Sequence, residues 1–447
     1  MDIQYAIGAV GLLLALLLLG VDIAIALGLS SLVGLMLLTG SFEATLTLAG
    51  NTMFAALNEY FLAVLVLFVL MGDFIKRSGC VRDSYVLIQR SLKGIPGRLG
   101  VATVLGNVVF AFITGSSIAA ASTFSRISYP EMKRHGYTNR FALGIVAGSA
   151  CLGMLIPPSA LMIVWGILTE VSIGKLFLSG VLPGLILASF FILIVVVHGI
   201  LFSSKHSVVA SGVNGSTAVS PAAPAEGEES TARLWLSTGW IVFLILAVIG
   251  GIWWGVFTPT EAAGVGAVLS LAIAFARGMT FSEMTESILD SGRTLAPIMI
   301  LIAMAILFSR MLAMSGFITV VQDWLMNSNL SKLQIFLLII GTWVLLGMFM
   351  DSFGIMVLTV PVFAPLAPAL GYDPIAFGLI GILALEVGLI SPPFGLVAFA
   401  VKSSIQDEAV KVGDIFMGSM PFMLALFLLI ALVSAFPSIA MYLPNLM

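Results

Sequence analysis

The sequence has few charged residues and few side chains that hold metals. Only 9% of its 447 residues are Asp, Glu, Lys or Arg and 60% are hydrophobic, whereas soluble proteins carry about 25% charged residues. The 2 cysteines and 3 histidines are too few for a disulfide framework or for a zinc or haem centre. These shortages exclude a soluble globular domain and metal-centred chemistry.

The charge that is present forms neither a basic surface nor a nucleotide-binding motif. The formal net charge is -3, and the 19 Lys and Arg residues are spread over many short loops, which excludes nucleic acid as a partner. No lysine stands in a G-x-x-x-x-G-K-[ST] motif. Any work that the chain does must therefore be driven by an ion gradient or by a partner.

Long apolar runs take up most of the chain. Uncharged stretches of roughly 20 residues recur, and each is long enough to cross a hydrocarbon core. The sequence therefore predicts an all-α polytopic membrane protein surrounded by membrane lipids. Residues 203–233 are rich in Ser, Ala, Pro and Glu and are predicted to form a flexible cytoplasmic linker between residues 1–202 and 234–447.

One uncharged segment is too short to cross the membrane twice. Residues 76–98 and 126–140 are both rich in Lys and Arg, and the positive-inside rule places both in the cytoplasm. The uncharged residues between them, 99–125, would reach roughly 40 Å as a helix, whereas two crossings need about 60 Å. This segment is therefore predicted to enter and return as a re-entrant hairpin, which needs cover from protein or a cavity.

The two halves of the chain share an internal repeat. Moving residues 106–164 forward by 235 positions gives eleven identities without a gap. The shared residues include Gly106 and Gly341, Ser117 and Ser352, Pro130 and Pro365, Gly136-Tyr137 and Gly371-Tyr372, Gly153 and Gly388, and Pro157-Pro158 and Pro392-Pro393. The second half is therefore predicted to hold a matching hairpin at about 334–360.

The repeat is predicted to be inverted. The flanks of the second hairpin carry few basic residues, so they are expected outside the cytoplasm. About ten spans plus two hairpins, with both termini outside, place 16 of the 19 Lys and Arg inside. Inverted repeats with discontinuous elements are typical of secondary transporters. An ion channel is the more distant alternative, because channels favour a ring of identical segments.

Oxygen-bearing side chains lie where the tips of both hairpins are expected. An intramembrane carboxylate is functional by default, so Asp351 is a candidate ion ligand. Small residues that allow close helix packing are the alternative interpretation of Gly115-Ser116-Ser117. The candidate residues are Thr114, Gly115, Ser116 and Ser117 in the first hairpin and Asp351 and Ser352 in the second.

Each Pro-Pro pair is predicted to break its helix, although isolated pairs are commonly only kinks. Because proline has no amide proton, each pair frees the two carbonyls four residues earlier, at 153 and 154 and at 388 and 389. Carbonyls beside hydroxyls suit sodium, and the N-termini of half-helices favour an anionic substrate. The candidate residues are Gly153, Pro157, Pro158 and Ser159 in the first half and Gly388, Ser391, Pro392 and Pro393 in the second.

Glu386 has two interpretations that the sequence leaves open. It lies six residues before Pro392 and either completes an ion shell or joins neighbouring helices by hydrogen bonds. Proton coupling is less favoured than sodium, because the predicted core offers only Asp351 and Glu386, whereas proton pathways use chains of carboxylates or histidines.

Five motifs together resemble a known family. They are Gly115-Ser116-Ser117, the segment from Gly153 to Ser159, the segment Phe257-Thr-Pro-Thr-Glu-Ala-Ala263, the segment from Gly347 to Asp351, and the segment from Glu386 to Gly395. The chain resembles the large membrane subunit of tripartite ATP-independent periplasmic (TRAP) transporters, within the ion transporter superfamily. The resemblance covers nearly the whole chain outside residues 203–233.

The resemblance implies sodium symport of small organic acids, such as C4-dicarboxylates or sialic acid, into a bacterium across its inner membrane. It implies an elevator mechanism and no cofactor besides sodium. The implied partners are a periplasmic binding protein and a small four-span membrane subunit, expected as a separate chain because nothing precedes the first span. A binding-protein-independent sodium/anion symporter of the same superfamily is the closest alternative.

The resemblance also implies two sodium sites. Gly115, Ser116 and Ser117 with the Pro157-Pro158 break would form one site, and Asp351 and Ser352 with the Pro392-Pro393 break the other. The first hairpin would gate the cytoplasmic side and the second the periplasmic side.

Overall fold

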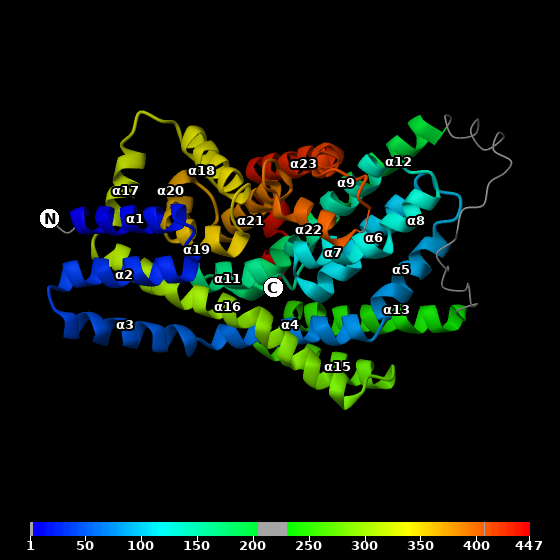
Figure 1. Ribbon diagram of the computed structural model, residues 1–447, viewed down its shortest axis with the longest axis horizontal. Coiled ribbons are helices and arrows are strands. Elements are labelled where there is room, and N and C mark those ends of the chain that lie inside the picture. The colour runs from blue at the N-terminus through cyan, green and yellow to red at the C-terminus, as the bar shows by residue number, and fades with distance from the viewer. Residues whose placement is uncertain (1–2, 204–229, 406) are drawn as a thin grey trace.

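The computed structural model describes residues 3–203, 230–405 and 407–447 (Figure 1). Over these ranges the regular structure is helical throughout, without a strand. Six helices there are long and apolar enough to cross a membrane, or up to eight if each of two bent pairs is one span. The all-α polytopic architecture is confirmed, and the ten spans stay a prediction. Most of the predicted linker, residues 204–229, lies outside the described residues.

One region of the molecule consists of the N-terminal helices and the helices that follow the linker. Helices α2, α3 and α4 all pack against the long helix α16, and α15 packs along α4 (Figure 1). Thr258 and Thr280 begin α15 and α16 with capping boxes, in which each threonine and the glutamate three residues later satisfy one another's amides. The helices are α1 (Ile3–Leu18), α2 (Ile23–Thr39), α3 (Phe42–Leu57), α4 (Tyr60–Arg77), α5 (Cys80–Ser91), α13 (Thr231–Ile245) with a π-helical turn (Leu246–Gly250), α14 (Gly251–Trp253), α15 (Pro259–Ala276), α16 (Phe281–Met314) and α17 (Phe317–Met326).

The other region holds the two predicted hairpins and the helices broken at the Pro-Pro pairs. Its elements from the first half are α6 (Arg98–Thr114), α7 (Ser117–Ile127), α8 (Tyr129–Arg134), α9 (Asn139–Ala150), α10 (Leu152–Leu155), α11 (Ala160–Thr169) and α12 (Ile173–Ser203). Those from the second half are α18 (Lys332–Gly347), α19 (Ser352–Phe363), a 3-10 turn (Ala364–Leu366), α20 (Ala367–Leu370), α21 (Pro374–Ile390), α22 (Leu396–Ser404), α23 (Val412–Ala435), α24 (Ser438–Met441) and a last 3-10 turn (Pro444–Leu446).

The helices on the two sides of each tip fold back on one another. The Phe110 ring of α6 meets the Phe124 ring of α7 edge to face, with centroids 5.7 Å apart. The indole N–H of Trp343 in α18 donates a hydrogen bond of 2.8 Å to the Thr359 hydroxyl in α19. Both segments are therefore helical hairpins, and each runs slightly beyond the predicted ranges of 99–125 and 334–360.

The helix bounds follow the offset found in the sequence. Moving α7 forward by 235 residues gives 352–362, and α19 spans Ser352–Phe363. Moving α9 and α10 together, 139–155, gives 374–390, which are the bounds of α21.

The two halves are interlocked in this region. Helix α7 of the first half packs against α22 of the second, and α19 of the second half packs against α11 of the first. Outside the apolar core, the Lys133 ammonium and the Tyr129 hydroxyl both donate to the Asp407 carboxylate. The Lys133 ammonium, with the Tyr129 hydroxyl, holds the pKa of Asp407 below its usual value. The hairpins and broken helices therefore form one packed body built from both halves.

Candidate functional site

The tip of the first hairpin lies directly on the first Pro-Pro break. Gly115 ends α6 with φ +55, and a Cβ there would lie 2.5 Å from the Pro158 carbonyl oxygen, so only glycine fits. The next residue, Ser116, begins α7 by accepting a hydrogen bond of 3.3 Å from the Ala119 amide. The amide of Ala160, just after the break, donates to the Gly115 carbonyl at 3.5 Å.

Gly153 brings the upstream part of the broken helix to the same place. A Cβ at this position would lie 2.9 Å from the Ser116 carbonyl oxygen and 3.1 Å from the Ser117 amide nitrogen. The predicted residues of the first site therefore come together, with hydroxyls and carbonyls from both the hairpin and the break.

Two of the four carbonyls predicted to be free have hydrogen-bond partners. The Ser159 hydroxyl folds back and donates to the Met154 carbonyl at 2.5 Å. At the second break the Ser391 amide donates to the Gly388 carbonyl at 3.0 Å. The prediction counted only the donors that proline removes, whereas the serine beside each pair supplies a replacement.

The tip of the second hairpin lies beside the second break. Asp351 begins α19 by accepting from the Phe353 and Gly354 amides, each at 3.0 Å. Phe349, just before the tip, packs against Phe394, just after the break, with ring centroids 5.8 Å apart. The hydroxyl of Ser352 is buried and has no hydrogen-bond partner among the described residues.

The remaining second-site candidates have structural partners or are exposed. A Cβ at Gly388 would lie 2.6 Å from the Gly347 Cα, so the broken helix touches the hairpin backbone there too. The Ser391 hydroxyl donates to the Val387 carbonyl at 2.6 Å. Pro392 and Pro393 are exposed.

One contact joins the two halves at the first tip. The Ser117 hydroxyl donates a hydrogen bond of 2.6 Å to the carboxylate of Glu386 on α21. Both side chains are buried. The sequence placed Glu386 near the second break, and no local pattern pointed to Ser117 as its partner.

A cavity of about 460 Å³ opens at the first tip and is lined from the other region by α4 and α16. From the hairpin it receives Thr114, Gly115 and Ser116. No local sequence pattern predicts the charged wall opposite them, because that wall forms only when α4 and α16 pack together. Its polar residues are Asp73, Lys76, Arg77, Asp290, Ser291 and Thr294.

Of the two cationic side chains in the charged wall, one is paired with carboxylates and the other forms no ion pair with a described residue. Arg77 is held by three carboxylates, those of Asp73 at 3.1 Å, Glu286 at 3.0 Å and Asp290 at 2.7 Å. Lys76 is exposed, and no carboxylate of the described residues pairs with it. A small anion in the cavity can therefore meet the Lys76 ammonium on one side and the polar hairpin tip on the other.

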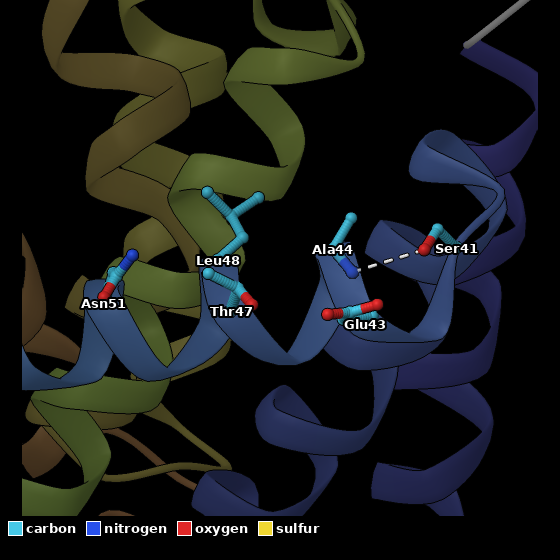
Figure 2. Close-up of a pocket in the computed structure, with 6 residues that line it drawn as sticks. All are labelled: Ser41, Glu43, Ala44, Thr47, Leu48 and Asn51. Carbon is cyan, nitrogen blue, oxygen red and sulfur yellow. Dashed lines mark hydrogen bonds between the residues drawn. The ribbon is translucent and has the colours of Figure 1, made fainter.

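A second hollow, of about 500 Å³, lies on the surface of α3 and contains no tip or break residue (Figure 2). Glu43, Thr47 and Asn51 follow one another at intervals of four residues along this helix, so they share one exposed face. The opposite face, with Thr45, Ala49, Thr52 and Ala56, is buried.

Comparison with known proteins identifies the family. A family model described as the DctM component of tripartite ATP-independent periplasmic transporters matches residues 10–439. The C4-dicarboxylate TRAP transporter large permease protein of Pseudomonas aeruginosa is 34% identical over 400 residues, with 88% of each chain covered. The protein of that name in Rhodobacter capsulatus is 30% identical over 457 residues, with 98% of each covered. The sialic acid TRAP transporter large permease protein of Vibrio cholerae is 28% identical over 405 residues, with 89% of each covered.

Solved structures agree on the fold. The YdaH transporter of Alcanivorax borkumensis superposes with a TM-score of 0.56 at 16% identity, covering 89% of this chain and 88% of that one. MtrF of Neisseria gonorrhoeae gives 0.55 at 13% identity, covering 87% and 83%. At these identities the likeness shows the fold alone. With the family match, the resemblance seen in the sequence is confirmed: the chain belongs to the family of large permease subunits of TRAP transporters, multi-pass transport proteins of the bacterial inner membrane, and is not an enzyme.

Proposed function

We propose that this chain imports small organic acids by sodium symport. The observation that carries the proposal is the first hairpin tip, where Gly115 and Ser116 meet the Pro157-Pro158 break and open onto a cavity with the Lys76 ammonium opposite. Hydroxyl and carbonyl oxygens suit a hard cation, and an ammonium suits a carboxylate. The relatives named for C4-dicarboxylates and sialic acid support a small carboxylate as substrate.

Two sodium sites are part of the proposal. The first uses Thr114, Ser116 and Ser117 with carbonyls near Gly153, Pro157 and Ser159. The second uses Asp351 and Ser352 with carbonyls near Gly388, Ser391 and Pro392-Pro393. The contacts of Gly153 with Ser116 and of Phe349 with Phe394 support this pairing of each tip with its own break.

Alternating access by an elevator motion is the proposed mechanism. The repeated helix bounds and the interlocked hairpins support two inverted repeats, residues 1–202 and 234–447, that together build one movable body. The cavity lies beside Lys76 and Arg77, at the end of α4 that the positive-inside rule assigns to the cytoplasm. In this conformation the site would face the cytoplasm, and both termini would be periplasmic.

Two protein partners complete the proposal. A periplasmic binding protein would deliver the substrate, and a separate small membrane subunit with four spans would pack on the large one. The polar face of α3 supports a protein neighbour there, since Glu43, Thr47 and Asn51 would be costly to leave against lipid (Figure 2). This face is therefore the proposed binding surface for the small subunit.

Uptake of labelled organic acids into proteoliposomes tests the proposal. The chain is reconstituted under a sodium gradient, with and without a candidate binding protein and small subunit. We expect uptake only with sodium and both partners. Uptake by this chain alone would identify a self-sufficient symporter, and uptake indifferent to sodium would remove the two ion sites.

A further inference from the structure

Glu386 is a buried carboxyl group whose role the proposed transport function leaves unassigned. It is 1% exposed and lies four residues before the end of the buried helix α21. One oxygen, Oε2, accepts a hydrogen bond of 2.6 Å from the Ser117 hydroxyl. The other, Oε1, has no hydrogen-bond partner within the described residues, and Glu386 takes part in none of their ion pairs. A buried carboxyl in this state requires a proton or a nearby cation.

The backbone of Glu386 lies at the contact between the two halves of the chain, which is called the seam below. Its carbonyl oxygen lies 3.9 Å from the Cys151 sulfur, which is equally close to the Ala147 carbonyl oxygen of α9. Glu386 and Cys151 are separated by 235 positions, the offset of the repeat. In a two-fold arrangement, equivalent positions touch each other only at the axis. The second half therefore places a carboxyl group where the first half has a thiol.

This difference changes the surroundings of two equivalent serines. Ser117 of the first half donates to Glu386 across the seam, whereas its equivalent, Ser352, has no hydrogen-bond partner among described residues. The residue before each serine offsets this difference in nearby carboxyl groups, because it is the neutral Ser116 in the first half and the acidic Asp351 in the second. Each tip thus has one carboxyl group beside it, its own Asp351 in one case and Glu386 from the opposite half in the other.

We propose that Glu386 is a positioning residue for the sodium site at the first hairpin tip. A hydroxyl has a single proton. Because the Ser117 hydroxyl donates its hydrogen bond to Glu386, the lone pairs of the hydroxyl are turned toward the ion. The negative charge of Glu386 then balances the charge of the ion from one hydrogen bond away. This inference rests on the proposed sodium coupling, and it makes sodium binding in the first half depend on a side chain of the second.

Sodium-dependent thermal stability of the purified full chain tests this role without knowledge of the substrate. Unfolding is followed in sodium chloride and in choline chloride at constant ionic strength, and the sodium concentration for half-maximal stabilisation is measured. We expect Glu386→Ala to raise that concentration about tenfold, because a charged partner of the ligand is lost. Glu386→Gln should raise it about threefold, since its amide oxygen still accepts the Ser117 proton but carries no charge.

The matched control is Ser149→Ala. Ser149 is also buried and accepts a hydrogen bond of 2.7 Å from the Asn107 side-chain amide, and it lies on α9, upstream of the Pro157-Pro158 break. It should unfold at a lower temperature in both salts with an unchanged sodium midpoint. If Glu386→Ala behaves in this way too, Glu386 only holds helices together and the inference is overturned.

Two further results keep the outcomes separate. A wild-type chain that does not respond to sodium would contradict the proposed sodium coupling itself, and the positioning role with it. If Glu386→Ala fails to fold, Glu386→Gln and Ser117→Ala decide: Ser117→Ala should raise the sodium midpoint, and adding Glu386→Gln to it should raise it little further. Fully additive effects would show that the two side chains act independently.

Discussion

The two hairpins have matching helix bounds but unequal surroundings. In the first, α6 buries eleven of its 17 residues, and the adjoining Pro157 and Pro158 are buried. In the second, α18 buries six of its 16 residues, and Pro392 and Pro393 are exposed. A repeat in sequence therefore does not give equal packing in one conformation. The proposed alternating access requires such an inequality, because in that mechanism the two tips are covered in turn.

Equivalent glycines provide the strongest test of this comparison. A Cβ at Gly106 would lie 2.7 Å from the Phe124 ring, whereas a Cβ at Gly341, 235 residues later, would meet no atom within 4 Å. We expect Gly106→Ala to cost about 2 kcal/mol through overpacking. Gly341→Ala should be neutral or stabilise by up to about 1 kcal/mol, as alanine does in an open helix. Thermal unfolding measures both, and equal losses would contradict the difference in packing.

The equivalent serines at the tips should differ by a smaller amount. Ser117→Ala leaves the buried Glu386 without its hydrogen-bond donor, which costs about 1–3 kcal/mol. Ser352→Ala removes a buried hydroxyl that has no hydrogen-bond partner in the described parts of the chain, so its cost should be close to zero. Unfolding in choline chloride keeps ion binding out of this comparison. A larger loss for Ser352→Ala would show that the second tip depends on a polar contact absent from this conformation.

Local sequence features indicated where the helices end and begin at the two tips and at the two proline pairs, whereas the re-entrant path through the membrane stays a prediction. Each of these indications depends on nearby residues: the length of an uncharged segment between basic loops, a glycine at a tip, and two adjacent prolines. The offset of 235 relates the helix bounds of one half to those of the other. The start of α16 was harder to predict, because the helix begins at Phe281 with a polar first part rather than with an apolar run.

Contacts between distant segments could not be predicted from the sequence. The bond from Ser117 to Glu386 spans 269 residues, and the charged wall of the cavity combines Lys76 with Asp290. Neither pair shares a local pattern, since each depends on how whole helices pack. Ser159 was predicted as a site residue, but its hydrogen bond to the Met154 carbonyl was not predicted. Proline spacing shows which carbonyl loses its donor but not which donor replaces it.

The helix caps at the starts of α7 and α19 should give the smallest difference in stability between the two hairpins. Asp351 and Ser116 hold equivalent positions, but Asp351 accepts from two amides and Ser116 from one. Both alanine variants should lose about 1 kcal/mol and weaken the response to sodium, while membrane insertion stays intact. Asp351→Asn removes the negative charge but keeps the helix cap, because asparagine caps a helix about as well as aspartate. It should keep the unfolding temperature in choline chloride and raise the sodium midpoint.

Asp373→Asn is the control for that variant. Asp373 begins α21 in the same way, accepting from the Ile375 and Ala376 amides at 2.8 and 3.4 Å, and it belongs to neither tip. Its replacement removes one negative charge and keeps the cap, so any general effect of charge on sodium affinity appears in both variants. A sodium midpoint that moves only with Asp351→Asn assigns the carboxylate to the second site. Equal shifts would mean that sodium senses the net charge of the chain, and the second tip would then be held together by its cap alone.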